Sequence, residues 1–236
     1  MTPEAGKLAG TRYRIEGAGP PLVLIHGVGM DLEMWDPVAR LLAARHRVLR
    51  YDMLGHGQSA KPPGPYRLDD FVRQLLALAD GLGLARFDLA GFSMGALVAQ
   101  GLALAAPGRV GRLVLLNGVY DRSAEERAAV ASRVQDVLDG SYAESVEAAL
   151  RRWFTPTFQA TRPEVLAWVR DRMAGNDLEA YAAAYEVFAT ADRELASAVG
   201  AIAAPTLVTT GSDDQRSTPA MAAALAARLP RGYPAP

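Results

Sequence analysis

The sequence of 236 residues contains no cysteine and only three histidines. Without cysteine the chain forms no disulfide and offers no thiolate to a metal ion, a composition typical of proteins in a reducing cytoplasm. An excess of one charge is also lacking, because 25 lysines and arginines stand against 26 aspartates and glutamates. This balance provides no electrostatic footprint for nucleic acid. We expect no cofactor, no metal ion and no nucleic-acid partner.

Long apolar runs and a basic leader are absent as well. No apolar segment approaches the roughly 20 residues that a membrane-spanning helix needs, and the N-terminus does not read as a signal peptide. Half of the residues are hydrophobic (50%), so a chain of this length can bury one sizeable core. The sequence therefore predicts a soluble cytoplasmic protein with no membrane partner.

What the sequence does contain is an alternation of strand-like and helical segments. This rhythm predicts an α/β fold with a mostly parallel, doubly wound sheet. Pattern and turn residues place strands at 12–16, 21–25, 47–51, before Ser93, at 112–116 and at 205–209, and helices at 33–44, 68–82, after Ser93 and at 219–229. The first of these strands alternates polar and apolar residues, which indicates an antiparallel edge strand. The last residues, Leu229–Pro236, have the pattern of neither a strand nor a helix.

The alternation stops between about residues 123 and 199, where only helical patterns occur. Helices are predicted at Ala124–Leu138, Tyr142–Trp153, Pro163–Ala174 and Leu178–Thr190. We interpret residues 122–199 as a helical cap over the C-terminal edge of the sheet. Residues 1–121 and 200–236 then form the core.

The segment Gly91-Phe92-Ser93-Met94-Gly95 lies between an apolar strand and an Ala-rich helix. A G-x-S-x-G sequence in this context predicts a sharp strand-to-helix turn with the serine at its apex. The first N–H groups of the helix have no partner inside it, so the amide of Met94 is free to bind an oxyanion. The plain alternative is a Gly/Ser turn with no chemistry.

Two further segments follow predicted strands. His26-Gly27-Val28-Gly29 is either a glycine turn or a loop that offers an amide; it is not a dinucleotide fingerprint, because Leu32 stands where the third glycine belongs. Gly211-Ser212-Asp213-Asp214 places two carboxylates after the last predicted parallel strand. Asp213 and Asp214 are both candidates for a catalytic acid, and both could instead simply cap the next turn.

Four motifs in this order resemble the α/β-hydrolase superfamily over essentially the whole chain: His26–Gly29, Asp52–Ser59, Gly91–Gly95 and Gly211–Asp214. More narrowly, the segments Met30–Pro37 and Arg152–Pro156 look like the 3-oxoadipate enol-lactonase group. The resemblance implies hydrolysis of a small carboxylic ester or enol-lactone.

The same resemblance implies roles for individual residues. Ser93 would be the nucleophile and Asp214 the acid, and the backbone amides of Val28 and Met94 would form the oxyanion hole. Among the cap aromatics we expect Trp153 to contact the substrate.

The resemblance also implies a histidine after the acid, and no histidine follows Asp214. His46 is expected at the opposite end of the sheet from Ser93, whereas His26 and His56 are expected to brace loops. The sequence therefore predicts a hydrolase without its last strand and histidine, whether by truncation, frameshift or degeneration. Impaired activity is expected, together with an exposed sheet edge through which a homodimer could form. The alternative is a non-catalytic relative that binds a small ligand or acts through its surface.

Overall fold

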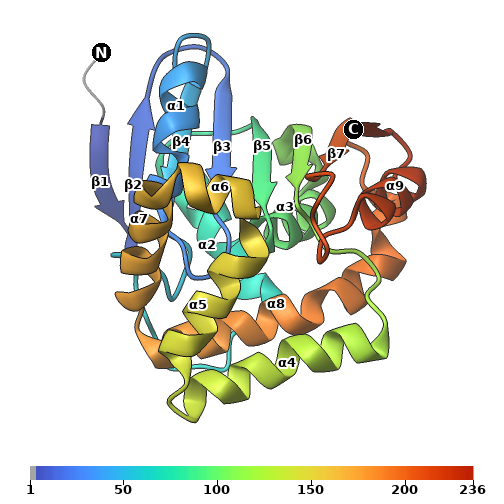
Figure 1. Cartoon of the computed structure of the whole chain (residues 1–236). Coiled ribbons are helices and arrows are strands. Elements are labelled where there is room, and N and C mark those ends of the chain that lie inside the picture. The colour runs from blue at the N-terminus through green and yellow to red at the C-terminus, as the bar shows by residue number, and fades with distance from the viewer. Residues whose placement is uncertain (1–3, 236) are drawn as a thin grey trace.

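The most apolar segments of the chain form the centre of a single eight-stranded sheet (Figure 1). The computed structural model describes residues 4–235, apart from the side chains of residues 136 and 138. The strand order is β1-β2-β4-β3-β5-β6-β7-β8. The strands are β1 Glu4–Leu8, β2 Thr11–Glu16, β3 Pro21–Ile25, β4 Arg47–Tyr51, β5 Phe87–Phe92, β6 Val110–Leu116, β7 Thr206–Thr209 and β8 Gly232–Ala235. Pairs β1–β2 and β2–β4 are antiparallel and all others are parallel, so the predicted α/β class is confirmed.

Strand β3 shows why the sheet is buried on both faces. Its side chains alternate between two hydrophobic clusters: Val23 and Ile25 join the larger one, whereas Leu22 and Leu24 join a smaller one with Trp35. Successive residues of a strand point to opposite faces, so a continuous apolar run fits a strand that is covered by helices on both sides.

Nine α-helices are described between residues 4 and 235. They are α1 Asp36–Leu42, α2 Leu68–Gly81, α3 Met94–Ala105, α4 Ala124–Leu138, α5 Tyr142–Trp153, α6 Pro156–Thr161, α7 Pro163–Ala174, α8 Leu178–Ala198 and α9 Pro219–Arg228. The helix predicted at 33–44 is divided into a 3-10 turn, Leu32–Trp35, and α1. Pro37 has no N–H and is therefore best placed in the first turn of a new helix. None of the helices in this range is both long enough and apolar enough to cross a membrane.

Helices α4 to α8 fill the part of the chain between β6 and β7, and this part adds no strand to the sheet among the described residues. A capping box of Ser123 and Glu126 starts α4, and the Asp177 side chain caps α8. Figure 1 shows α4 and α8 lying side by side across one end of the sheet. The division of the chain at residues 122 and 199 into core and cap stays a prediction.

The N-terminal edge differs from the prediction. β2 is not an edge strand, because β1 pairs with it through a two-residue turn of Ala9 and Gly10, both with positive φ (46° and 81°). The segment Glu4–Leu8 has no β-branched residue, so its own composition does not favour a strand. Pairing is possible because Gly6 has no side chain: a Cβ there would lie 2.7 Å from the Tyr13 hydroxyl.

The C-terminal edge also differs. The last strand, predicted to be missing, is present as β8, which pairs in parallel with β7. Its sequence is Gly-Tyr-Pro-Ala, which has low strand propensity, but Pro234 is tolerated where an edge strand needs no further N–H donor. Gly232 is required by packing, since a Cβ there would lie 2.1 Å from the carbonyl oxygen of Ala226 in α9. The edge of β7 is therefore covered, and the reason for expecting a homodimer through it disappears.

Candidate active site

Ser93 occupies the turn between β5 and α3 in a backbone conformation that is rare for a residue with a side chain. Its φ is 54° and its ψ −116°, and its amide donates to the Leu116 carbonyl of β6 at 2.8 Å. The flanking glycines permit the turn: a Cβ on Gly91 would lie 2.1 Å from the Gly95 carbonyl oxygen, and one on Gly95 would lie 2.5 Å from that of Ile25. The predicted strand-turn-helix geometry is confirmed, and strain of this kind is concentrated at functional sites.

The loop that follows β3 lies directly against this serine. A Cβ placed on Gly27 would be 3.4 Å from the Cβ of Ser93. The loop turns tightly, because the Met30 amide donates to the Gly27 carbonyl at 3.2 Å. Met94 is the first residue of α3, so its amide has no acceptor inside the helix. The turn thus brings Val28 and the start of α3 to the same side of the sheet.

Asp214 lies on the loop after β7, at the same edge. Its Oδ1 accepts from the amides of Arg216 (2.8 Å) and Ser217 (2.9 Å). Its Oδ2 accepts from the Asn117 side-chain amide at 2.8 Å and lies 3.3 Å from the Thr210 hydroxyl, which donates to the Ser217 carbonyl at 2.7 Å. These hydrogen bonds fix the Asp214 carboxylate in position. Asp213, the alternative acid, is exposed, and the geometry therefore favours Asp214.

Asn117 was missed by sequence reasoning. It follows β6, adopts a positive φ of 49° and donates to Asp214. It also directly follows Leu116, whose carbonyl binds the amide of Ser93. The dipeptide Asn117-Gly118 after a strand was a usable signal, because asparagine tolerates the left-handed conformation better than most residues.

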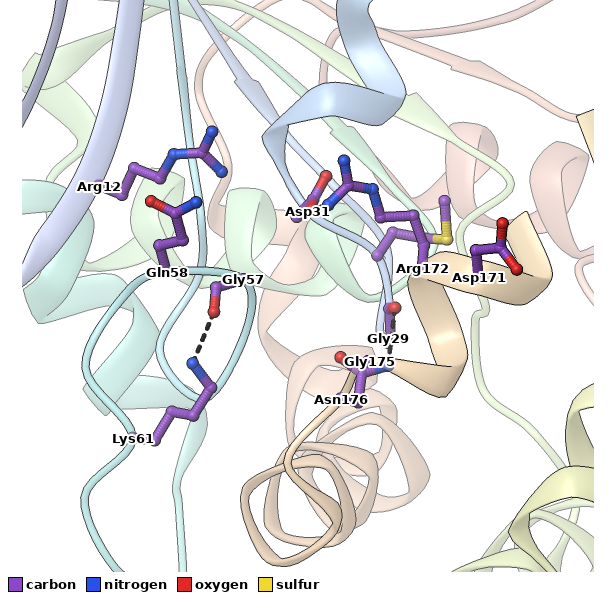
Figure 2. A pocket seen from close by; sticks show the side chains of 11 residues that line it. Arg12, Gly29, Asp31, Gly57, Gln58, Lys61, Asp171, Arg172, Gly175 and Asn176 are labelled. Atoms are coloured by element: carbon purple, nitrogen blue, oxygen red, sulfur yellow. Dashed lines mark hydrogen bonds and ion pairs between the residues drawn. The ribbon is translucent and has the colours of Figure 1, made fainter. Parts of the chain in front are cut away.

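A polar cavity of about 160 Å³ lies between the loop after β3, the turn at residues 57–61 and the end of α7 (Figure 2). Arg172 of α7 reaches into it, forms an ion pair with Asp31 at 2.7 Å and contacts Glu33. Burial raises the pKa of Asp31 to about 6, an effect that the Arg172 guanidinium partly opposes. The arrangement joins the helices between β6 and β7 to the loop beside Ser93.

The two histidines near this edge, His26 and His56, are buried and bond to the backbone. His26 is fully buried, accepts from the Met53 amide through Nε2 (2.9 Å) and contacts the Gly27 carbonyl through Nδ1 (2.7 Å). His56 is equally buried, its Nδ1 lies 2.9 Å from the Leu54 carbonyl, and its Nε2 has no partner among the described residues. Because a carbonyl accepts, Nδ1 carries the proton in both rings. Burial lowers the pKa of His26 to about 4 and that of His56 to about 3.

His46 precedes β4, and Arg47 pairs with Pro21 at the start of β3. Since Ser93 follows the end of β5, and β3, β4 and β5 run parallel, His46 lies at the far end of the sheet, as predicted.

These lowered pKa values predict a loss of stability in mild acid. The unfolded chain takes up a proton on each histidine near pH 6.5, well above the folded pKa of His26 and of His56, so the free energy of unfolding falls as the pH falls from about 6.5. Between pH 7.5 and pH 5 each histidine contributes a loss of about 2 kcal/mol. Urea denaturation at the two pH values measures it. Asp31 has the opposite effect: because its pKa is raised to about 6, its contribution to the free energy of unfolding increases as the pH falls over this range.

The variant His56→Asn isolates one of the two histidines. Asn does not titrate, so the difference in unfolding free energy between pH 7.5 and pH 5 should shrink by about 2 kcal/mol relative to the parent. An unchanged difference would contradict the assignment of His56 as a buried neutral residue.

Trp153 is the last residue of α5 and is 46% exposed. Its contact with a substrate stays a prediction. In residues 4–235 no group of three or more histidine, aspartate or glutamate side chains is placed to hold a metal ion.

This arrangement of sheet, strained serine turn, facing loop and acid defines the α/β-hydrolase class. The sequence profile of the family described as alpha/beta hydrolase fold matches residues 20–234, and the chain belongs to that family.

The relatives to which the chain is similar include two hydrolases of Acinetobacter baylyi and a solved enol-lactonase structure. It is 36% identical to (E)-2-((N-methylformamido)methylene)succinate hydrolase over 93% of this chain and 82% of the relative. It is 32% identical to 3-oxoadipate enol-lactonase 2 over 84% of this chain and 73% of the relative. The structure of the enol-lactonase from Burkholderia xenovorans superposes with a TM-score of 0.88 at 34% identity, covering 98% of this chain and 90% of that one. The chain is thus an α/β-hydrolase enzyme that resembles the enol-lactonases.

Proposed function

We propose that the protein hydrolyses a small carboxylic ester or enol-lactone with Ser93 as nucleophile. The observation that carries this proposal is the positive φ of Ser93 in a turn that the loop after β3 faces closely. The enol-lactonase relatives support the substrate class. The absence of cysteine from the sequence supports a cytoplasmic location.

The mechanism follows from what each group can do. The Ser93 Oγ attacks the ester carbonyl carbon while its proton passes to water, and the carbonyl oxygen becomes an oxyanion. The amides of Val28 and Met94 donate to that oxygen, and loss of one such donor typically costs about 3 kcal/mol of transition-state stabilisation. The leaving group departs as an alkoxide or enolate and takes a proton from water. A further water molecule then hydrolyses the acyl-enzyme, which releases the acid and restores the Ser93 hydroxyl.

Asp214 would orient a general base, and the three histidines of this sequence do not supply one. The Nε2 lone pair of His26 is occupied by the Met53 amide, His56 is buried, and His46 lies at the far end of the sheet. A serine hydroxyl without a base is a weak nucleophile. We therefore propose that these 236 residues catalyse slowly, by about 10³ to 10⁴ over water, which is what an oxyanion hole and substrate binding supply without the full triad.

The second candidate function is the binding of a small ligand without catalysis. The observation that favours it is that His26 and His56 bond to backbone groups and do not serve as a general base.

The two functions differ in their response to Ser93→Ala. If Ser93 is the nucleophile, hydrolysis of phenyl acetate by the parent exceeds the uncatalysed rate and falls by at least about 10² in the variant. Mass spectrometry of the parent treated with a fluorophosphonate should find the label on Ser93. The matched control is Ser132→Ala, on the exposed face of α4, which should retain the parent rate. Equal rates for parent and Ser93→Ala would contradict the nucleophile, and neither turnover nor label would favour the binding function.

A further inference from the structure

The helices between β6 and β7 pack directly against the loop that faces Ser93. The contact point is Gly29, which has a φ of 78°. A Cβ on Gly29 would lie 2.9 Å from the Tyr181 ring, 3.5 Å from Met173 Cε and 3.6 Å from Asn176 Nδ2. Two of these residues belong to α7 and α8, and Asn176 lies between those helices. A residue other than glycine does not fit here, so the loop backbone itself forms the contact.

Asn176 makes the one hydrogen bond at this contact that involves the loop backbone among the described residues. Its side-chain amide donates to the Gly29 carbonyl at 2.9 Å (Figure 2). The same amide donates to the Tyr142 hydroxyl at 3.1 Å. The Tyr142 hydroxyl donates in turn to the Met173 carbonyl at 2.7 Å, and Tyr142 is buried. Tyr142 of α5, itself bonded to α7, therefore fixes the Asn176 side chain in the position from which it reaches the loop.

The hydrogen bond from Asn176 is connected to Val28 through the backbone of the loop. The Gly29 carbonyl belongs to the same peptide unit as the Met30 amide, which donates to the Gly27 carbonyl at 3.2 Å. The Gly27 carbonyl belongs to the same peptide unit as the Val28 amide. Two hydrogen bonds thus link Asn176 to the orientation of the Val28 N–H, and successive hydrogen bonds of this kind polarise one another.

We propose that Asn176 is a positioning residue that holds the Val28 amide in the orientation needed for the oxyanion, so that the helices between β6 and β7 and the oxyanion hole form one unit. This inference rests on the proposed function of Ser93 and Val28. Glycine at position 29 allows the peptide to rotate freely when unrestrained, and Asn176 removes that freedom. His26 Nδ1 also bonds to the Gly27 carbonyl (2.7 Å), so loss of Asn176 weakens the geometry without abolishing it.

The test uses phenylboronic acid, a neutral trigonal compound that becomes a tetrahedral anion when its boron bonds to a serine Oγ and the serine proton passes to solvent. An oxygen on the boron then lies where the oxyanion would lie. In Asn176→Asp, which keeps the size of the side chain but loses its N–H donor, the inhibition constant of the boronate should rise about tenfold. The kcat for phenyl acetate should fall about tenfold while KM stays within twofold, because only the transition state uses the Val28 amide.

Controls separate this inference from its premise. Glu147→Gln removes an exposed ion pair with Arg170 between α5 and α7 and should leave kcat and the boronate constant unchanged. If Asn176→Asp does not fold, Asn176→Ser replaces the amide with a hydroxyl too short to reach the Gly29 carbonyl, adds no charge and should give the same tenfold change. Binding of boronate that is lost in Ser93→Ala but unchanged in Asn176→Asp and Asn176→Ser overturns the inference alone. Boronate binding that survives Ser93→Ala, or none in the parent, overturns the proposed function and the inference with it.

Discussion

Extending this chain with the histidine loop and final helix of an enol-lactonase relative is expected to raise kcat/KM on phenyl acetate by about 10³-fold or more. The elements that the histidine would serve are in place: Ser93 is strained in its turn, and Asp214 is fixed by Asn117 and by two backbone amides. In the proposed mechanism, none of the three histidines of this sequence accepts the Ser93 proton. Because β8 already pairs with β7, the extension needs to add only the segment that follows this strand.

The matched control is the same extension with alanine in place of its histidine, which should leave the rate at the level of the unextended chain. Equal rates for the two extended proteins would show that the histidine is not the missing group. High activity in the unextended chain that disappears in His26→Ala or His56→Ala would instead identify a buried histidine as the base, against the hydrogen bonds that both rings make.

Replacing Gly91 with alanine is expected to destabilise the protein by at least about 3 kcal/mol and to remove hydrolysis. The added Cβ would lie 2.1 Å from the Gly95 carbonyl oxygen and 2.7 Å from the Ala96 amide nitrogen. Both atoms belong to the backbone of α3, so no side-chain rotation relieves the clash. The turn can accept the methyl group only by moving α3 away from β5, which displaces Ser93. Urea denaturation measures the loss of stability.

Gly108 offers a control with the same chemical change. It lies in a 3-10 turn, no atom lies within 4 Å of an added Cβ, and its φ is not positive. Gly108→Ala should stay within about 0.5 kcal/mol of the parent and keep its activity. If Gly91→Ala were as stable as Gly108→Ala, the close packing of strand and helix at the turn would not be what the glycine serves.

The sequence alone determined the parts of this protein that depend on local pattern. Continuous apolar runs such as Pro21–Ile25 favour buried parallel strands, and the helix predicted at Ala124–Leu138 has the same bounds as α4. The turn at Ser93 is equally local, because strand, glycines and helix are consecutive in the chain. The placement of an acid after β7 followed from the order of elements in the family.

Only the tertiary structure decided what depends on partners distant in sequence. β1 and β8 have weak strand propensity, and each forms by pairing with a neighbouring strand. The pairing is possible because residues 6 and 232 are glycines, placed where Tyr13 and α9 leave no room for a side chain. The bond between Asn176 and the Gly29 carbonyl joins residues 147 positions apart. Propensity is a property of neighbours along the chain, whereas burial, lowered histidine pKa values and these long-range hydrogen bonds exist only after the chain has packed.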